Sequence, residues 1–117
     1  MSAPRLADYL MHILTAIQRI GEYTAGLDSE GFATDERTQD AVIRNLEVIG
    51  EASHRIQARH PDFVAEHPEL PLSSAYQMRN AVAHGYFEVD TDIVWKTVVN
   101  DLPALAELVR ASLNARS

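Results

Sequence analysis

The segment 78–86 gathers several side chains that could act on a phosphate. It contains Arg79, Asn80, His84 and Tyr86 at the predicted end of a helix. Asn80 and His84 are four residues apart and therefore share one helix face, since an α-helix repeats every ~3.6 residues. Arg79 starts about 100° away around the helix, but its long side chain reaches toward the same edge. The spacing therefore predicts a guanidinium, an imidazole and a hydroxyl close to one another.

These groups suit cleavage of a phosphodiester without a metal ion. The planar fork of Arg79 can bind two phosphate oxygens and stabilise the charge that develops on them. His84 can take a proton from a nucleophile or give one to a leaving oxygen near neutral pH. RNA supplies its own nucleophile, because the 2′-hydroxyl can attack the adjacent phosphorus. The expected products are a 2′,3′-cyclic phosphate and a 5′-hydroxyl, and the reaction calls for no cofactor.

Each chain supplies only one such arginine and one such histidine, which is a sparse set of groups for this reaction. A two-fold dimer that joins the two helix ends would place two of each in one cleft. On spacing alone, a plainer interpretation is favoured, because Arg-x4-His is common in helical proteins and a helix that ends in His-Gly is an ordinary C-terminal cap. The motif by itself leaves both interpretations open.

Apolar residues at steps of three and four predict helices along most of the chain. One helix is expected to carry its apolar stripe over residues 6–20 and to fray at Gly21 and Gly26, followed by a polar connection over 27–33. A second helix opens at Thr34 or Asp35, both good N-caps, and runs to about Arg59.

Three prolines between residues 60 and 72 exclude a long helix there, apart from one turn near 62–65. A third helix, capped by Ser73 or Ser74, is expected over 75–84.

A final helix is expected after Asp90 or Thr91, and Pro103 should kink it near Asn100 or split it. No strand-like alternation of useful length is present. The predicted fold class is therefore all-α, an antiparallel bundle of four to five helices.

The expected helices differ in length, at about 18 and 25 residues for the first two and about ten for the third. A long helix beside a short one leaves part of its apolar stripe uncovered within one chain, and a dimer is the simplest cover. Gly50 lies in the middle of the second helix, where glycine costs up to about 1 kcal/mol relative to alanine. Its presence indicates a close approach to another helix, for instance across a dimer seam.

The composition is that of an ordinary globular chain and supports a single domain over residues 1–117. Ten Lys+Arg against 17 Asp+Glu give a net charge of −7, so RNA binding would require a local basic cleft. The lack of cysteine excludes disulfides, thiolate zinc sites and cysteine nucleophiles. Without a long apolar run or a signal-peptide core, a cytoplasmic location with no membrane association is expected.

Several separated segments together resemble the HepT-like family of HEPN-domain ribonuclease toxins. Arg79, His84 and Tyr86 match the family's Arg-x4-His-x-Tyr motif one by one. The resemblance extends from about residue 35 to about residue 105, in the family's order and spacing. The segments that carry it are DERTQDAVIRNLEVIGEA at 35–52, MRNAVAHGY at 78–86, DIVW at 92–95 and NDLP at 100–103.

This resemblance implies a HEPN-like helical homodimer that acts on RNA as a metal-independent endoribonuclease, the toxin of a type VII-like HEPN/MNT toxin–antitoxin pair. Arg79 would stabilise the transition state, His84 would act as acid and base, and Asn80 would orient the phosphate or the histidine. The partner would be a minimal nucleotidyltransferase (MNT) antitoxin, bound to the dimer or in a larger assembly. That antitoxin would transfer AMP units to Tyr86, where the added charge pairs with Arg79 and repels an RNA phosphate.

The second helix offers candidates for holding Arg79 in place. Asn45 and Glu51 are the expected supporting residues, because a polar group at this point of the helix could hydrogen-bond the guanidinium, as the resemblance loosely suggests. A solvated face is an equally good interpretation. The histidines show no metal-ligand spacing, so no metal site is predicted.

Two other classes of function remain open at this stage. The chain could be a non-catalytic helical module that binds a nucleotidyltransferase and its nucleotide, with the motif serving only for docking. It could also be a structural helical dimer with no nucleotide partner. An adjacent gene for a nucleotidyltransferase would support the pairing, although not the activity.

Overall fold

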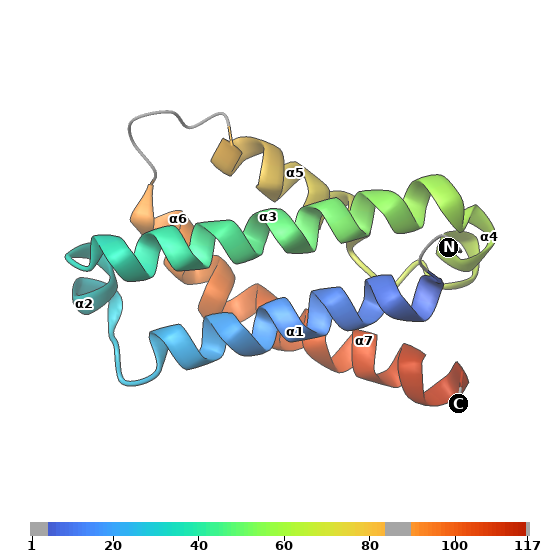
Figure 1. Cartoon of the computed structure of the whole chain (residues 1–117), viewed down its shortest axis with the longest axis horizontal. Helices are drawn as coiled ribbons and strands as arrows, with labels where there is room; N and C mark the ends of the chain where they lie inside the picture. The colour runs from blue at the N-terminus through green and yellow to red at the C-terminus, as the bar shows by residue number, and fades with distance from the viewer. Residues whose placement is uncertain (1–4, 84–89, 117) are drawn as a thin grey trace.

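The computed structural model describes residues 5–83 and 90–116, and every regular element within those two ranges is helical. Figure 1 shows α3 lying between α5 and α1, with each neighbour antiparallel to it. This confirms the predicted all-α antiparallel bundle. The elements are α1 (Leu6–Thr24), α2 (Ser29–Ala33), α3 (Glu36–Arg59), α4 (Pro61–Glu66), α5 (Leu72–Ala83), α6 (Thr91–Lys96), the π-helical turn η1 (Thr97–Asp101) and α7 (Leu102–Arg116).

The longest helix, α3, begins where the sequence predicts. Asp35 is its N-cap: one carboxylate oxygen accepts the Thr38 backbone N–H at 3.1 Å and the other accepts the Thr38 hydroxyl at 2.7 Å. These hydrogen bonds stabilise the charged form and hold the pKa of Asp35 below its ordinary value of 3.8. From this cap α3 runs for 24 residues to Arg59, as expected.

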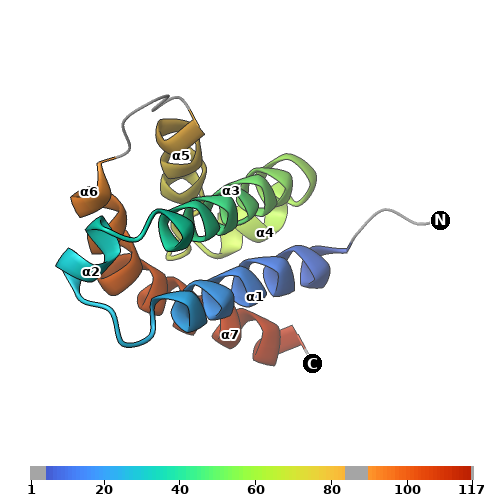
Figure 2. The same ribbon diagram turned by 60° about the vertical axis from the view of Figure 1, so that its left-hand side comes forward.

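The stretch 27–33, predicted as a polar connection, instead contains α2. Asp28 caps this helix by accepting the backbone N–H of Gly31 at 2.8 Å. Phe32 is buried, and its ring packs on Trp95 with 5.4 Å between centroids. Figure 2 shows α2 and α6 together at the end of the bundle where α3 begins. The prediction was wrong because a single buried aromatic residue anchors a helix too short to show a periodic pattern.

The start of α5 also differs from the prediction, because this helix begins at Leu72 rather than at residue 75. The backbone N–H of Ala75 already donates to the carbonyl of Pro71 at 3.0 Å, so neither Ser73 nor Ser74 is the N-cap. Leu72 is buried in the core, and this burial sets the boundary.

Pro103 splits the final helix, as predicted. The helix opens after Asp90, whose carboxylate accepts the backbone N–H groups of residues 92 and 93. Between α6 and α7, η1 forms a π-helical turn in which Leu102 donates its N–H to Thr97, five residues back. Pro103 has no N–H, so the regular pattern cannot continue through it. Figure 1 shows the chain changing direction between α6 and α7.

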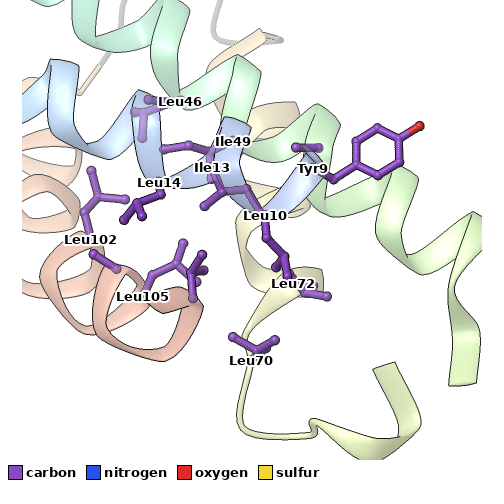
Figure 3. Close-up of a cluster of buried hydrophobic side chains, with 14 of the residues drawn as sticks. Tyr9, Leu10, Ile13, Leu14, Leu46, Ile49, Leu70, Leu72, Leu102 and Leu105 are labelled. Carbon is purple, nitrogen blue, oxygen red and sulfur yellow. The ribbon is translucent and has the colours of Figure 1, made fainter. Parts of the chain in front are cut away.

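The hydrophobic core lies among α1, α3 and α7, with further side chains from Leu70 and Leu72 (Figure 3). The apolar stripe of α3 is at most 3% exposed within the single chain, so the expectation that part of it needs a partner was wrong. Helices α1 and α5 flank α3 and help to cover it. The stripe consists of Val42, Leu46, Ile49, Ser53 and Ile56. Among the described helices, none is both long and apolar enough to cross a membrane.

Candidate active site

Gly50 is the point at which α3 and α5 approach most tightly around Arg79. A Cβ atom placed on Gly50 would overlap the Cβ of Arg79, and it would lie 2.7 Å from the Arg79 Cγ and 3.2 Å from the Ala75 carbonyl oxygen. The sequence correctly indicated a close helix approach here. The approach is made by α5 of the same chain, so glycine lets the Arg79 backbone lie directly against the middle of α3.

Two side-chain contacts continue the line of contact between α3 and α5, here called the seam, toward the start of α5. The imidazole of His54 stacks on the ring of Tyr76 with 4.4 Å between centroids. The side-chain amide of Gln57 donates to the Ser73 hydroxyl at 2.7 Å. Each step of three or four residues forward on α3 is matched by three residues backward on α5, which is the register of antiparallel helices. The seam therefore fixes the position of Arg79 along α3.

Arg79 is one wall of a groove on the outward face of α3, which we call the arginine groove. The α3 residues that line it recur at steps of three, four or one, so they occupy one side of that helix. Residues of α1 line it on the other side of α3, and its volume is about 550 Å³. The complete lining is Tyr9, His12, Arg44, Glu47, Val48, Glu51, Ala52, Arg55, Arg59 and Arg79.

The arginine groove is basic although the chain is acidic. It holds four of the ten Lys+Arg residues and only two of the 17 Asp+Glu residues. Glu51 accepts a hydrogen bond from the Arg55 Nε–H at 2.9 Å, in an ion pair whose two side chains are each 46% exposed. The groove therefore meets the condition that the net charge of −7 sets for binding a nucleic acid, namely a local concentration of guanidinium groups.

The two expected supporting residues lie in different places. Asn45 is buried, and its side-chain amide donates to the Ala41 carbonyl of its own helix at 2.9 Å. Glu51 lines the arginine groove together with Arg79 while it pairs with Arg55. Support of the Arg79 guanidinium by either residue stays a prediction.

The structure places only part of the predicted catalytic set. Arg79 is partly buried in α5 and reaches the groove. Asn80 belongs to the same helix, but its side chain, like all of His84 and Tyr86, lies outside the described residues. Within residues 5–83 and 90–116, no three His, Asp or Glu side chains gather as metal ligands.

The sequence interpretation missed most of the groove. Arg44, Arg55 and Arg59 were not singled out, nor was His12 on the facing helix. A signal was present: residues 44, 55 and 59 are separated by eleven and four positions, both close to whole turns of an α-helix. Placing His12 opposite them required the packing of α1 against α3.

A second hollow lies where α3 and α5 face η1 and α7, and it is apolar. Leu46, Ile49 and Met78 contribute to its walls, and its volume is about 370 Å³. Glu69 stands at its edge, where a hydrogen bond from its own backbone and one from His67 lower the pKa of this carboxyl below its ordinary 4.5. We call this feature the apolar hollow.

The guanidinium groups that line the arginine groove have the chemistry to bind phosphate oxygens. The model of the family described as "Ribonuclease HepT-like" matches residues 13–112. The chain belongs to this HepT-like ribonuclease family.

Individual relatives agree with the family match. The chain is 47% identical over 98 residues to "Probable ribonuclease HepT" of Thermococcus cleftensis, which covers 84% of this chain and 86% of that protein. It is 33% identical to a "Putative RNase" of Caldanaerobacter subterraneus subsp. tengcongensis, covering 97% of this chain and 96% of the relative. A Methanocaldococcus jannaschii protein named "Gamma-glutamylcyclotransferase and putative RNase" is 37% identical over 85% of this chain, which spans 43% of that longer protein. No solved structure matches the chain significantly.

Proposed function

We propose that this protein is an endoribonuclease that cleaves RNA without a metal ion. The observation that carries the proposal is the arginine groove, which concentrates guanidinium groups around Arg79 in a chain of net charge −7. Membership of the HepT-like ribonuclease family supports the same conclusion. The RNA phosphates would bind to the groove, with the bond to be cut near Arg79.

In the proposed reaction the 2′-hydroxyl of RNA attacks the adjacent phosphorus. His84 takes the proton of that hydroxyl, the new P–O2′ bond forms, and the P–O5′ bond breaks. A second imidazole, in its protonated form, gives a proton to the departing O5′. Arg79 stabilises the negative charge that develops on the phosphoryl oxygens, and Asn80 orients the phosphate or the histidine. The products are a 2′,3′-cyclic phosphate and a 5′-hydroxyl.

The need for two imidazoles is the argument for a homodimer. One chain carries a single copy of the motif, whereas a two-fold dimer brings two copies into one cleft. The apolar stripe of α3 adds nothing to this argument, because it is already covered within one chain. Sedimentation equilibrium would test the dimer, and a monomer that cuts RNA at full rate would contradict it.

We also propose that this nuclease is the toxin of a toxin–antitoxin pair and acts in the cytoplasm. A minimal nucleotidyltransferase antitoxin would transfer AMP from a nucleoside triphosphate to the Tyr86 oxygen, with release of pyrophosphate. The added phosphodiester would occupy Arg79 and repel RNA. Tyr86→Phe should abolish the AMP mass shift that the partner produces, whereas an undiminished shift would place the modification elsewhere.

The test of the nuclease is cleavage of a single-stranded RNA in the presence of a metal chelator. The wild-type chain should produce 2′,3′-cyclic phosphate ends, and His84→Ala should abolish both cleavage and toxicity while it leaves the dimer folded. His67→Ala is the matched control, because His67 packs on Phe63 and pairs with Glu69 away from the arginine groove. Cleavage that survives in His84→Ala would contradict the mechanism.

The competing function is a non-catalytic module that docks a nucleotidyltransferase. A purified dimer that is inactive on several RNAs, but tightly bound to a nucleotidyltransferase encoded beside it, would favour that alternative over the nuclease.

A further inference from the structure

The arginine groove extends well beyond the position of Arg79. Arg79 lies against Gly50, whereas Arg59 is nine residues farther along α3. At 1.5 Å per residue this separation is about 13 Å. The groove is therefore long enough along α3 to take more than one phosphate of a nucleic-acid strand. A ligand with two or more phosphates along a chain would fit the whole length of the groove.

The remote end of the groove is built by Arg55 and Arg59 on α3 and by His12 on α1. The two arginines are four residues apart, so their side chains leave the same face of α3 one turn apart. His12 is exposed, and its ring makes an edge contact with the buried ring of Tyr9, with 6.2 Å between centroids. Tyr9 is anchored at the edge of the core, where Figure 3 shows its hydroxyl directed away from the other labelled side chains.

The ion pair with Glu51 leaves further N–H donors at this remote end. The hydrogen bond to Glu51 uses the Nε–H of Arg55, which is one of five N–H donors on a guanidinium. Because both partners of this ion pair are half-exposed, the pair is weak and can rearrange around a phosphate. Arg59 lies one further turn along the same face, away from Glu51.

We propose that Arg55 and Arg59, with His12 across the groove, bind RNA phosphates beyond the one at the bond that is cut. The inference rests on the proposed function, and it adds a substrate-binding site that favours long RNA over short fragments. It also places the bound strand along α3, from Arg79 toward the end of that helix at α4.

The test is binding of fluorescent RNAs of two and twelve nucleotides to the double variant Arg55→Gln/Arg59→Gln. The twelve-nucleotide RNA should bind on the order of tenfold more weakly than it binds to the wild type. The slope of log affinity against log salt should fall by about 0.7 for each phosphate that the variant no longer binds. The preference for long over short RNA should shrink accordingly.

The matched control is Arg19→Gln/Arg110→Gln, which removes the same two charges from exposed positions on α1 and α7. This variant should bind the twelve-nucleotide RNA as the wild type does. The single variant Arg59→Lys gives a second check, because it keeps the charge and should keep the salt slope. Circular dichroism of every variant verifies that the helices are retained.

The inference is overturned if the Arg55/Arg59 variant and the control bind the long RNA with the same affinity and salt slope. It is also overturned if the variant only changes the sedimentation of the protein, since the groove would then be an interface between protein chains. The nuclease proposal survives either result as long as His84→Ala abolishes cleavage. Conversely, weakened RNA binding by the variant would establish an RNA-binding site at Arg55 and Arg59, whereas a wild type that cuts no RNA would overturn the nuclease proposal alone.

Discussion

The arginine groove and the apolar hollow are both built on α3 and α5, yet they depend on different kinds of residue. Met78 faces the hollow, and its neighbour Arg79 lines the groove. The walls of the hollow include core residues whose burial stabilises the fold. The groove is lined mainly by side chains that reach solvent and are positioned by the backbone beneath them. The residues that stabilise the fold are therefore largely separate from those that line the groove, and the two sets meet at Gly50.

The largest effect on stability is expected on the apolar side. Leu46 is 3% exposed and lines the hollow, so Leu46→Ala should lower the free energy of unfolding by about 2–5 kcal/mol, because a cavity replaces buried methyl groups. Two residues away, Arg44 is exposed in the groove, and Arg44→Ala should change stability by less than about 0.5 kcal/mol. Urea unfolding measures both. Equal losses in the two variants would show that the regions are not separable.

Gly50 tests the link between the two regions. Gly50→Ala should destabilise the chain by about 1–3 kcal/mol, because the new methyl group overlaps Arg79 and forces α3 and α5 apart. The control is Gly21→Ala in α1, where a Cβ would meet nothing within 4 Å. Gly21→Ala should instead raise the free energy of unfolding by up to about 1 kcal/mol, because alanine has a higher helix propensity than glycine. If Gly50→Ala is equally stabilising in thermal unfolding, the tight approach of the seam is wrong.

The smallest effect on stability is expected at Asp35, the N-cap at which α3 begins. Its pKa is lowered in the folded chain, so the unfolded chain binds this proton more tightly. The stabilisation is present above the ordinary value of 3.8 and is lost as the pH falls through the lower folded pKa. The variant Asp35→Asn keeps a side-chain oxygen that can cap the helix, but it has no carboxyl group that titrates.

Thermal unfolding of the wild type and Asp35→Asn between about pH 5 and about pH 2 checks this. The advantage of the wild type should shrink toward acid pH. A difference in melting temperature that does not change with pH would exclude the carboxylate as its source.

Much of the fold could be predicted because its signals are local. The period of the apolar residues located α1 and α3, Asp35 marked where α3 begins, and Pro103 marked the split before α7. The start of α5 could not be predicted in this way, because it depends on the burial of Leu72 by other helices. Local patterns specify elements, whereas their exact limits depend on tertiary packing.

The site could be predicted only in part, for a related reason. Arg79 belongs to a compact motif, so the sequence predicts it. Gly50 indicates a close contact but does not identify the partner helix. Arg59 and His12 come together only when α1 packs beside α3, so no local pattern relates them. His84 and Tyr86 keep their predicted roles as proposals.

We propose that RNA lies along the arginine groove. Photocrosslinking of a twelve-nucleotide RNA containing 4-thiouridine to the His84→Ala chain, with mass-spectrometric mapping of the modified peptides, tests it most directly. Crosslinks are expected in residues 44–59 of α3 and near His12 of α1. Crosslinks confined to α2, α6 and α7 would contradict the claim.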